Sequence, residues 1–287
     1  MVRRGGPSDA TRPRNLRVPR DHRRGPAQRG EVSDSLAGVV LAAGLGTRMR
    51  PLTTLRAKAL CPLGAATLLD HALDRLASVG LRGPRAVAVN AHHRAAEVVA
   101  AVADRALMSV EPELLGSAGA IGALAGWVAA RPLLVTNADA YLAGGIGDLL
   151  AGWDGDTLRL LVTPAPGGSD FGPWRFVGCS LLPARLHGRL APRPSGLYEE
   201  CWHAEVASGR AELVPYDGAF FDCGTPADYL AANLHESGGR TVVGTGAVVV
   251  GTARRCVVWP DSVVGPDEHL FETIRAESLT VAAPQTR

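Results

Sequence analysis

From about residue 36, short apolar runs alternate with longer amphipathic segments. Uniformly apolar runs predict strands that are buried on both faces, at 38–42, 86–90, 108–112, 133–139 and 158–164. Segments with helical periodicity lie between them, at 67–79, 94–104 and 116–130. Strands that alternate with helices predict an α/β fold with a Rossmann-like, mostly parallel sheet and helices on both faces.

The segment 67–79 shows the helical pattern most clearly. Its apolar side chains share one face, at Leu69, Ala72, Leu73 and Leu76. Thr67 is expected to cap the helix and Gly80 to end it. Asp74 and Arg75 are expected on the solvent side.

The pattern changes after residue 163. The stretch 164–174 is rich in Pro and Gly, which predicts a loop, and 175–183 and 211–216 predict strands. A helix is expected at 198–207. Asp222 then follows a short apolar run, and Thr225 is placed to cap a last helix with Pro226 at its first position.

The last part of the chain has a weak repeat. Val-Gly pairs recur at 243–244, 250–251 and 264–265, which favours a short β appendage that resembles a left-handed β-helix, with a pair of hairpins as the alternative. Two coils bury too little apolar surface to fold alone. We therefore expect the appendage to pack on the rest of the chain or on a second subunit of a homo-oligomer.

Charge and composition separate the first residues from the rest. Residues 1–30 contain nine Arg and two Asp, a net charge of +7, while the remaining 257 residues carry −5. The Arg- and Pro-rich stretch 1–35 predicts a disordered tail, either an extension without a function, which we favour, or an arm for anionic partners. The mildly acidic body gives no reason to expect nucleic-acid binding.

Two further features bear on the cellular setting. The five cysteines are scattered, which favours reduced thiols in a cytoplasmic protein over disulfides or a zinc site. No run of 18 apolar residues is present, so we expect no membrane span.

Polar groups follow four of the predicted strands at their carboxyl ends. They are the loop 43–48, Asn90, Glu111, and the pair Asn137 and Asp139. A parallel sheet brings these ends to one rim, where ligands of such folds bind. The sequence therefore predicts one site from residues that lie up to a hundred positions apart.

The loop after the first strand has the composition of a polyphosphate site. Its small residues Ala43 to Thr47 include two glycines, which let several backbone N–H groups approach one anion. Arg48, Arg50 and Lys58 add positive charge, and Lys58 is the only lysine in the chain. Met49 replaces the third glycine of the dinucleotide fingerprint, and no Lys follows the second glycine as in a Walker loop.

The motif from Leu41 to Thr53, with G-x-G-T-R followed by P-L-T and then Lys58, resembles the signature of the sugar-1-phosphate nucleotidylyltransferases. V-N-A-H-H at 89–93 is similar to the mannose-1-phosphate guanylyl and N-acetylmuramate-1-phosphate uridylyl branches. The resemblance covers roughly 38–233. It implies a catalytic domain at 36–240, between the tail 1–35 and the appendage 241–287.

The resemblance implies a Mg²⁺-dependent enzyme that transfers a nucleotidyl group from a nucleoside triphosphate to a sugar 1-phosphate and releases pyrophosphate. GTP with a mannose- or heptose-type phosphate is the favoured pair. Asp139 and Asp222 match the two metal-binding carboxylates. Arg48 is expected on the β- and γ-phosphates and Lys58 on the α-phosphate, which makes Arg48, Lys58 and Asp139 the catalytic candidates.

Nucleotide contacts are expected from Leu41, Ala42, Ala43, Gly44, Gly46, Thr47, Asn90, Glu111, Gly116, Ser117 and Asn137. Gly116 and Ser117 belong to E-P-E-L-L-G-S-A-G-A, which is similar to the segment of the family that reads the base. Arg175 and Gly178 are expected on the side of the sugar phosphate.

One segment departs from the family. The usual G-x-x-x-x-x-E-K-P, whose Glu and Lys hold the sugar and its phosphate, is shortened to 164–176 and contains neither residue. Arg175 is the candidate replacement for the Lys. Two alternatives remain open: a catalytically impaired homologue that binds nucleotide or NDP-sugar, and transfer to a non-sugar phosphate such as phosphocholine. The second needs an aromatic cage, for which the candidates are Trp174, Phe176, Tyr198 and Trp202.

Overall fold

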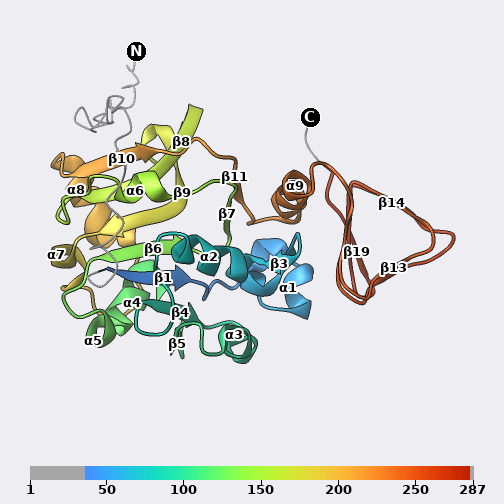
Figure 1. The fold of residues 1–287 in the computed structure, drawn as a ribbon, viewed down its shortest axis with the longest axis horizontal. Helices are drawn as coiled ribbons and strands as arrows, with labels where there is room; N and C mark the ends of the chain where they lie inside the picture. Colours follow the sequence, from blue (N-terminus) through green and yellow to red (C-terminus); the bar gives the residue numbers. More distant parts are fainter. Residues whose placement is uncertain (1–35, 285–287) are drawn as a thin grey trace, which may run out of the picture.

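A seven-stranded sheet forms the centre of the molecule in a computed structural model that describes residues 36–284 (Figure 1). The strand order is β10-β8-β9-β6-β1-β4-β5. The strands are β1 (Ala37–Leu41), β4 (Val87–Ala91), β5 (Leu107–Val110), β6 (Leu133–Asn137), β8 (Leu158–Ser169), β9 (Gly172–Leu182) and β10 (Ala211–Pro215). The tail predicted at 1–35 lies outside the described residues.

Most neighbouring strands of this sheet run parallel. β6, β1, β4 and β5 form a parallel block, and β10 is parallel to β8. β9 runs antiparallel to both β6 and β8. In the parallel block, Leu41 lies beside both Asn90 and Asn137, so the predicted rim is formed by the carboxyl ends of these strands.

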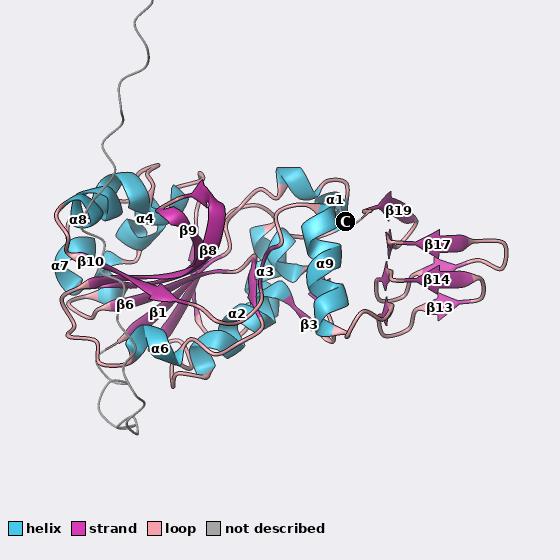
Figure 2. Ribbon diagram, turned by 90° about the horizontal axis from the view of Figure 1, so that it is seen from above, coloured by secondary structure: helices cyan, strands magenta, loops and turns pink. Residues whose placement is uncertain are grey.

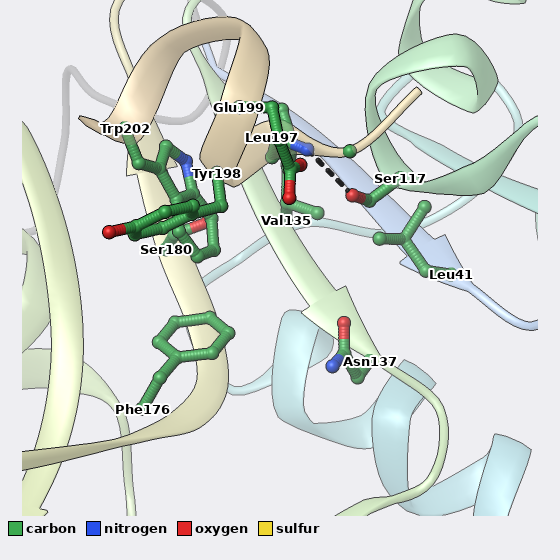
Figure 3. Close-up of a pocket in the computed structure, with 11 residues that line it drawn as sticks. Leu41, Ser117, Val135, Asn137, Phe176, Ser180, Leu197, Tyr198, Glu199 and Trp202 are labelled. Carbon is green, nitrogen blue, oxygen red and sulfur yellow. Dashed lines mark hydrogen bonds between the residues drawn. The ribbon is translucent and has the colours of Figure 1, made fainter. Parts of the chain in front are cut away.

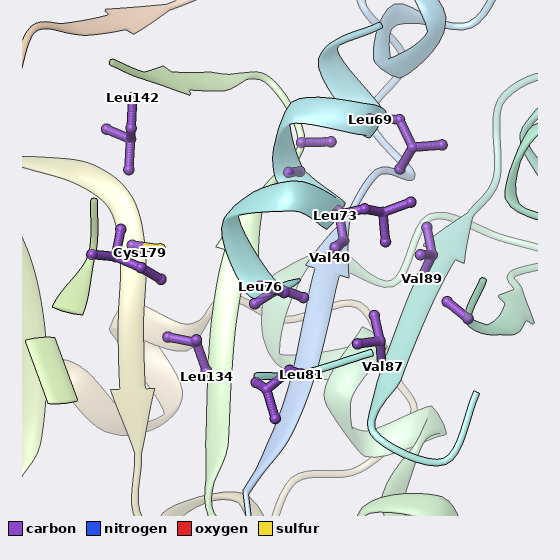
Figure 4. Close-up of a cluster of buried hydrophobic side chains, with 14 of the residues drawn as sticks. Val40, Leu69, Leu73, Leu76, Leu81, Val87, Val89, Leu134, Leu142 and Cys179 are labelled. Carbon is purple, nitrogen blue, oxygen red and sulfur yellow. The ribbon is translucent and has the colours of Figure 1, made fainter. Parts of the chain in front are cut away.

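Helices α2 (Leu68–Ala77), α3 (Ala95–Val102) and α6 (Gly147–Leu150) cover one face of the sheet. Leu69, Leu73 and Leu76 of α2 pack on the apolar side chains of β1, β4 and β6 (Figure 4). Thr67 caps α2 with a capping box, because its hydroxyl accepts from Asp70 N while the Asp70 carboxylate accepts from Thr67 N. The sequence prediction for this helix and its cap is confirmed.

The opposite face is covered by five short helical segments. They are α4 (Gly116–Ala123), α5 (Ala125–Val128), α7 (Ala184–His187), η3 (Tyr198–Trp202) and α8 (His203–Ala207). The single helix predicted at 116–130 is therefore wrong, because the chain breaks at Leu124 between α4 and α5. The segment contains four glycines, which are poor helix formers, so it lacks the propensity to continue as one helix.

Arg75 is buried and does not face solvent, which corrects the sequence prediction. Only 7% of its surface is exposed. The guanidinium donates to the Thr136 hydroxyl at 2.5 Å and to the carbonyl oxygens of Asn137 and Ala140. These hydrogen bonds let a charged side chain lie among the apolar residues of α2 and β6.

The stretch 164–174 is a β-hairpin arm, where the sequence predicted a loop. β8 continues to Ser169, β9 begins at Gly172, and Pro164 pairs with Trp174. The register is irregular between Pro164 and Ser169. Pro and Gly are tolerated in this arm because it extends beyond the sheet, where few ladder hydrogen bonds are needed.

Smaller elements complete the rim. β7 (Ala140–Leu142) pairs antiparallel with β11 (Phe220–Asp222), and α9 (Pro226–Glu236) follows with Thr225 as its N-cap. The loop after β1 leads through η1 (Thr47–Met49), α1 (Leu52–Leu55), η2 (Lys58–Leu60), β2 (Pro62–Leu63) and β3 (Ala66–Thr67) to α2.

The C-terminal residues form triangular coils at one end of the molecule, with α9 between them and the sheet (Figures 1 and 2). Parallel strands pair along each side of the coil: β12 with β15 and β15 with β18 on one side, β13 with β16 on the second, and β14 with β17 on the third. The bounds are β12 (Val242–Val243), β13 (Val248–Val249), β14 (Thr252–Arg254), β15 (Val257–Val258), β16 (Val263–Val264), β17 (His269–Phe271), β18 (Thr273–Ala276) and β19 (Leu279–Ala282). A β-helix-like appendage is thus present where hairpins were the alternative.

The appendage packs on the rest of the chain through one apolar cluster. Trp259 is fully buried in it, donates from its indole N–H to the Tyr229 hydroxyl at 3.0 Å, and receives the Arg56 guanidinium on its ring. Other large apolar side chains of the appendage are exposed, namely Val243, Val248, Val249, Val250, Val263 and Phe271. A homo-oligomer formed through this surface stays a prediction.

Within residues 36–284, no helix has the length and apolar character that crossing a bilayer requires. All five cysteines are free and buried. The cytoplasmic location stays a prediction.

Candidate active site

The loop from Ala42 to Gly46 leaves β1 and turns back at a left-handed glycine. Gly46 has φ +63°, and a Cβ there would lie 2.7 Å from Thr53 Cγ2 and 3.1 Å from Lys58 Cβ. Thr53 donates from its hydroxyl to Gly46 O at 2.8 Å. Only glycine fits this turn, which packs the loop directly against the segment that carries Lys58. Gly44, in contrast, faces open space.

Two buried polar side chains support the loop through hydrogen bonds. Asn90 Oδ1 accepts from Ala42 N at 2.7 Å, and Asn90 Nδ2 donates to Glu111 Oε1 at 2.7 Å. Glu111 Oε2 accepts from Leu115 N at 3.0 Å. Both residues are 3% exposed, and each carboxylate oxygen of Glu111 already has a donor. Asn90 and Glu111 therefore connect the first loop to the start of α4, and direct nucleotide contact by them stays a prediction.

Lys58 and Asp139 form an ion pair at the centre of the rim. Lys58 Nζ lies 2.5 Å from Asp139 Oδ2, although 81 positions separate the two residues. The side chain of Lys58 is 11% exposed and that of Asp139 is 35% exposed. The only lysine of the protein is thus held beside the glycine loop by an accessible carboxylate.

Asp222 reaches the same place from β11. It pairs with Ala140 across the β7–β11 ladder, and Cys223 N donates to Asp139 O at 3.0 Å. The two predicted metal-binding aspartates are therefore neighbours in the fold, Asp139 in the turn just before β7 and Asp222 at the end of β11. Arg175 of β9 approaches Asp222, with 3.5 Å between Arg175 Nη2 and Asp222 Oδ2.

Arg48 extends from the loop to the turn after Asp222. A Cβ on Gly224 would lie 2.8 Å from Arg48 Nη2, so the glycine gives the guanidinium its space. Thr47 and Arg48 are exposed. Burial, and then the neighbouring Asp139 carboxylate, raise the pKa of Cys223, so this thiol remains protonated beside the site.

The glycines of α4 allow the segment 191–197 to pack closely against this helix. Gly116 has φ +69°, and a Cβ there would lie 2.5 Å from Ser195 O. Ala118 N donates to Ser195 O at 3.0 Å, and Leu197 N donates to Ser117 Oγ at 2.9 Å. The segment predicted to read the base is therefore also the support on which η3 is placed.

Two adjoining clefts open at the rim. The smaller, of about 30 Å³, is lined by Leu41, Ala42, Gly44, Lys58, Ala59, Ala138 and Asp139. The larger, of about 240 Å³ (Figure 3), is lined by Leu41, Ser117, Val135, Asn137, Phe176, Ser180, Gly196, Leu197, Tyr198, Glu199 and Trp202. Leu41 borders both, so a phosphate beside Lys58 and a group in the larger cleft lie in neighbouring spaces.

Gly178 of β9 lies under the turn that carries Asp139. Its φ is +84°, and a Cβ would lie 2.7 Å from Ala140 Cβ and 3.4 Å from Asn137 Cβ. This close packing accounts for glycine at this position. Contact between Gly178 and a sugar phosphate stays a prediction.

The donor set at the rim suits Mg²⁺. This ion takes one or two carboxylates and fills its remaining positions with phosphate oxygens and water. Asp139, in the turn before β7, and Asp222, which pairs with the first residue of β7, would supply two carboxylates. Within residues 36–284, no group of three or more His, Cys, Asp and Glu side chains is arranged to hold a metal by itself.

Comparisons with known proteins show which family the chain resembles. The family model described as nucleotidyl transferase matches residues 37–164. N-acetylmuramate alpha-1-phosphate uridylyltransferase of Caulobacter vibrioides is 28% identical over 230 residues, which cover 68% of this chain and 94% of that protein. Mannose-1-phosphate guanyltransferase of Schizosaccharomyces pombe is 27% identical over 234 residues, which cover 68% of this chain and 62% of that protein.

The chain belongs to the sugar-1-phosphate nucleotidyltransferase family. Its relatives are transferases of the EC 2.7.7 type.

Solved structures share the fold of this nucleotidyltransferase. A putative glucose-1-phosphate thymidylyltransferase from Bacillus anthracis, in complex with a sucrose, has a TM-score of 0.58 at 16% identity and covers 70% of this chain and 94% of that one. HddC from Yersinia pseudotuberculosis, complexed with GMP-PN, has a TM-score of 0.57 at 17% identity and covers 70% and 99%.

Three residues of the rim were not predicted from the sequence. Arg75 could have been found, since it follows Ala72 by three positions and so shares the buried face of α2. Ser180 and Glu199 of the larger cleft carry no motif, and Trp202 beside them was considered only as part of an aromatic cage. They come together only through the packing of β9 and η3.

Proposed function

We propose that this enzyme transfers a nucleotidyl group from a nucleoside triphosphate to a sugar 1-phosphate, giving an NDP-sugar and pyrophosphate. The observation that carries the proposal is the convergence of the glycine loop, the Lys58–Asp139 pair and the Asp222 turn at one edge of the sheet. Backbone N–H groups of residues 42–47 would bind the triphosphate. Asn90 and Glu111 would keep that loop in shape from below.

The reaction requires positioning and charge neutralisation more than covalent chemistry by the protein. An oxygen of the sugar phosphate attacks the α-phosphorus and forms a new P–O bond. The bond from the α-phosphorus to the bridging oxygen breaks, and the electron pair leaves with pyrophosphate. The nucleophile is already ionised, so no general base is needed.

Each cation has a role that follows from its position. Lys58, held beside the loop by Asp139, would neutralise charge on the α-phosphate. Arg48, beside Gly224, would bind the β- and γ-phosphates and the leaving pyrophosphate. Mg²⁺ on Asp139 and Asp222 would offset negative charge on the phosphate oxygens when bound.

For the substrates, we propose GTP with a mannose- or heptose-type 1-phosphate. The V-N-A-H-H motif and the similarity to mannose-1-phosphate guanyltransferases support this pair. The similarity to a uridylyltransferase requires that UTP be included in the test.

The test is a grid of four nucleoside triphosphates against several sugar 1-phosphates with Mg²⁺, measured as pyrophosphate release. Lys58→Ala and Asp139→Asn should each lower kcat/KM by about 100-fold or more, because each removes charge stabilisation at the reacting phosphates. Asp148→Asn, at an exposed position on α6, is the matched control. If both site variants turn over like the parent, the assigned roles are wrong.

A second function is a homologue that binds nucleotide without transfer. The observation that favours it is the hairpin 164–174, which contains neither the Glu nor the Lys of the family segment. Calorimetry that detects Mg²⁺-nucleotide binding, with no pyrophosphate released anywhere in the grid, would support it.

A further inference from the structure

Two buried polar atoms in the larger cleft have no hydrogen-bond partner among residues 36–284. They are Ser180 Oγ and Trp202 Nε1, in residues that are 1% and 8% exposed. Both residues line the same cleft, beside Asn137 at the end of β6. Buried donors are nearly always satisfied in native proteins, so two unpaired donors around one cavity point to a bound group.

A carboxylate lies in the same cleft. Glu199 lies on the first turn of η3, and its side chain fills the space in which a Cβ on Gly196 would lie. Figure 3 shows it directed into the cleft, with Phe176 and Asn137 on the other side. Within residues 36–284 Glu199 has no ion pair, whereas the neighbouring Glu200 pairs with Arg193 at 3.1 Å.

Aromatic rings supply the remaining surface of the cleft. Phe176 and Trp202 pack edge to face, with ring centroids 4.8 Å apart, and Tyr198 is 43% exposed. This lining matches a hydroxyl-rich ring. The carboxylate can accept hydrogen bonds from the ring, the indole and the hydroxyl can donate to it, and the aromatic surface can cover its apolar face. The volume of about 240 Å³ lies below the roughly 300–1,000 Å³ of sites for drug-sized ligands, as expected for one monosaccharide.

The cleft is next to the reacting phosphate. Asn137, two residues before Asp139, lines it, and Arg175, the neighbour of Phe176, reaches Asp222. We propose that this cleft binds the sugar ring of the acceptor and that Glu199 accepts hydrogen bonds from its hydroxyls. The inference rests on the proposed nucleotidyl transfer. It assigns to η3 the sugar-binding carboxylate that the shortened hairpin lacks.

The assignment predicts a choice among sugars. An unpaired carboxylate repels an acidic sugar and favours a neutral one with adjacent hydroxyls. Phosphocholine would also use the aromatic rings and the negative charge, but it would leave both buried donors without an acceptor. Neutral hexose 1-phosphates should therefore be better acceptors than glucuronate 1-phosphate or phosphocholine.

The experiment compares Glu199→Gln with the matched control Glu200→Gln. KM is measured for mannose 1-phosphate, glucose 1-phosphate and glucuronate 1-phosphate at saturating nucleotide. Glu199→Gln should raise KM for the best neutral sugar 1-phosphate by about tenfold, as expected for lost hydrogen bonds to a charged group. It should also lower the preference for glucose over glucuronate at least fivefold, and leave KM for the nucleotide within twofold. Trp202→Phe, which removes one donor and keeps a ring, should raise the same KM.

The outcomes separate this inference from the proposed function. If Glu199→Gln behaves like Glu200→Gln in KM and in the neutral-to-acid ratio, the inference is overturned. Phosphocholine as the best acceptor would overturn it as well. If no acceptor supports turnover, the proposed function fails, and saturation-transfer NMR with mannose 1-phosphate and glucose 1-phosphate then tests the cleft directly. Binding to the parent that is lost in Glu199→Gln supports the inference, and no binding, or equal binding, refutes it.

Discussion

Replacing Gly178 by alanine would put a methyl group against the turn that carries Asp139. Gly178 has φ +84°, and the new Cβ would lie 2.7 Å from Ala140 Cβ and 3.4 Å from Asn137 Cβ. The first distance is shorter than carbon atoms tolerate, and Ala140 belongs to β7, which pairs with Asp222. The substitution should therefore lower stability and disturb both carboxylates.

The magnitude has three parts. A left-handed backbone costs alanine about 1–2 kcal/mol, and overpacking a well-filled site costs a further ~1–3 kcal/mol. Alanine also lowers the conformational entropy of the unfolded chain relative to glycine, which stabilises the folded state by about 0.4–1 kcal/mol. The free energy of unfolding should fall by roughly 2–4 kcal/mol, which corresponds to a Tm lowered by about 5–15 °C for a chain of this size.

Gly168→Ala separates the two costs. Gly168 has the same φ of +84°, but the nearest atom to its Cβ would be Gly172 O at 3.8 Å. Its free energy of unfolding should therefore fall by about 1 kcal/mol or less, which is the backbone strain reduced by the effect on the unfolded chain. Ala140→Gly, introduced together with Gly178→Ala, removes the atom that the new methyl group meets and should restore most of the packing loss.

Urea unfolding followed by circular dichroism measures the stability of the parent and these three variants, and pyrophosphate release measures their activity. The packing argument is refuted if Gly178→Ala is no less stable than Gly168→Ala, or if Ala140→Gly does not recover stability. If Gly178→Ala keeps full stability and loses only affinity for the sugar phosphate, Gly178 is a contact residue and not a packing residue.

Two further predictions concern buried charge and buried thiols. Arg75→Met should lower the free energy of unfolding by about 2–4 kcal/mol, because Thr136 Oγ1 and the carbonyl oxygens of Asn137 and Ala140 lose a charged donor; a urea midpoint equal to that of the parent would contradict this. Burial raises the pKa of Cys61 from 9.0 to about 12 and that of Cys201 to about 11. Unfolded thiols lose their protons near pH 9 while the folded ones keep them, so stability should fall as the pH rises from 9 toward 11, by up to about 1.4 kcal/mol per unit for each thiol. Urea midpoints at pH 8, 9.5 and 10.5 measure this slope, which Cys61→Ala should reduce; an equal slope in that variant would count against the assignment.

The sequence predicted the parallel block and its rim well because both depend on local patterns. Each buried strand is a short apolar run, and the polar residue that follows it marks the carboxyl end. The sequence placed Lys58 and Asp139 at one rim because each lies shortly after a buried strand, but their 2.5 Å ion pair was not predicted. Helix α2 was equally clear, since the Thr67 cap and its apolar face are encoded within a dozen residues.

Buried polar residues were harder to assign because their partners are distant in sequence. Nucleotide contact by Asn90 and Glu111 stays a prediction, and their hydrogen bonds to one another and to the backbone could not be foreseen from the sequence. Arg75 was expected in solvent, yet it holds the β6–β7 turn through carbonyl oxygens more than 60 positions away. Whether a polar side chain binds substrate or supports the backbone depends on tertiary hydrogen bonds that no local pattern encodes.

The packing of α4 against the segment that leads to η3 also depends on tertiary contacts. The glycines of α4 leave no side chain between the helix and the segment 191–195, and Gly116 and Gly119 face backbone atoms of Ser195 and Arg193. Ser117 then accepts from Leu197 N and fixes the start of η3, which carries Glu199 two residues later. A residue of the motif predicted to read the base thus also positions the carboxylate of the larger cleft. Any side chain larger than hydrogen at Gly116 or Gly119 would push this segment outward and move Glu199, so we expect a substitution there to change affinity for nucleotide and for acceptor together.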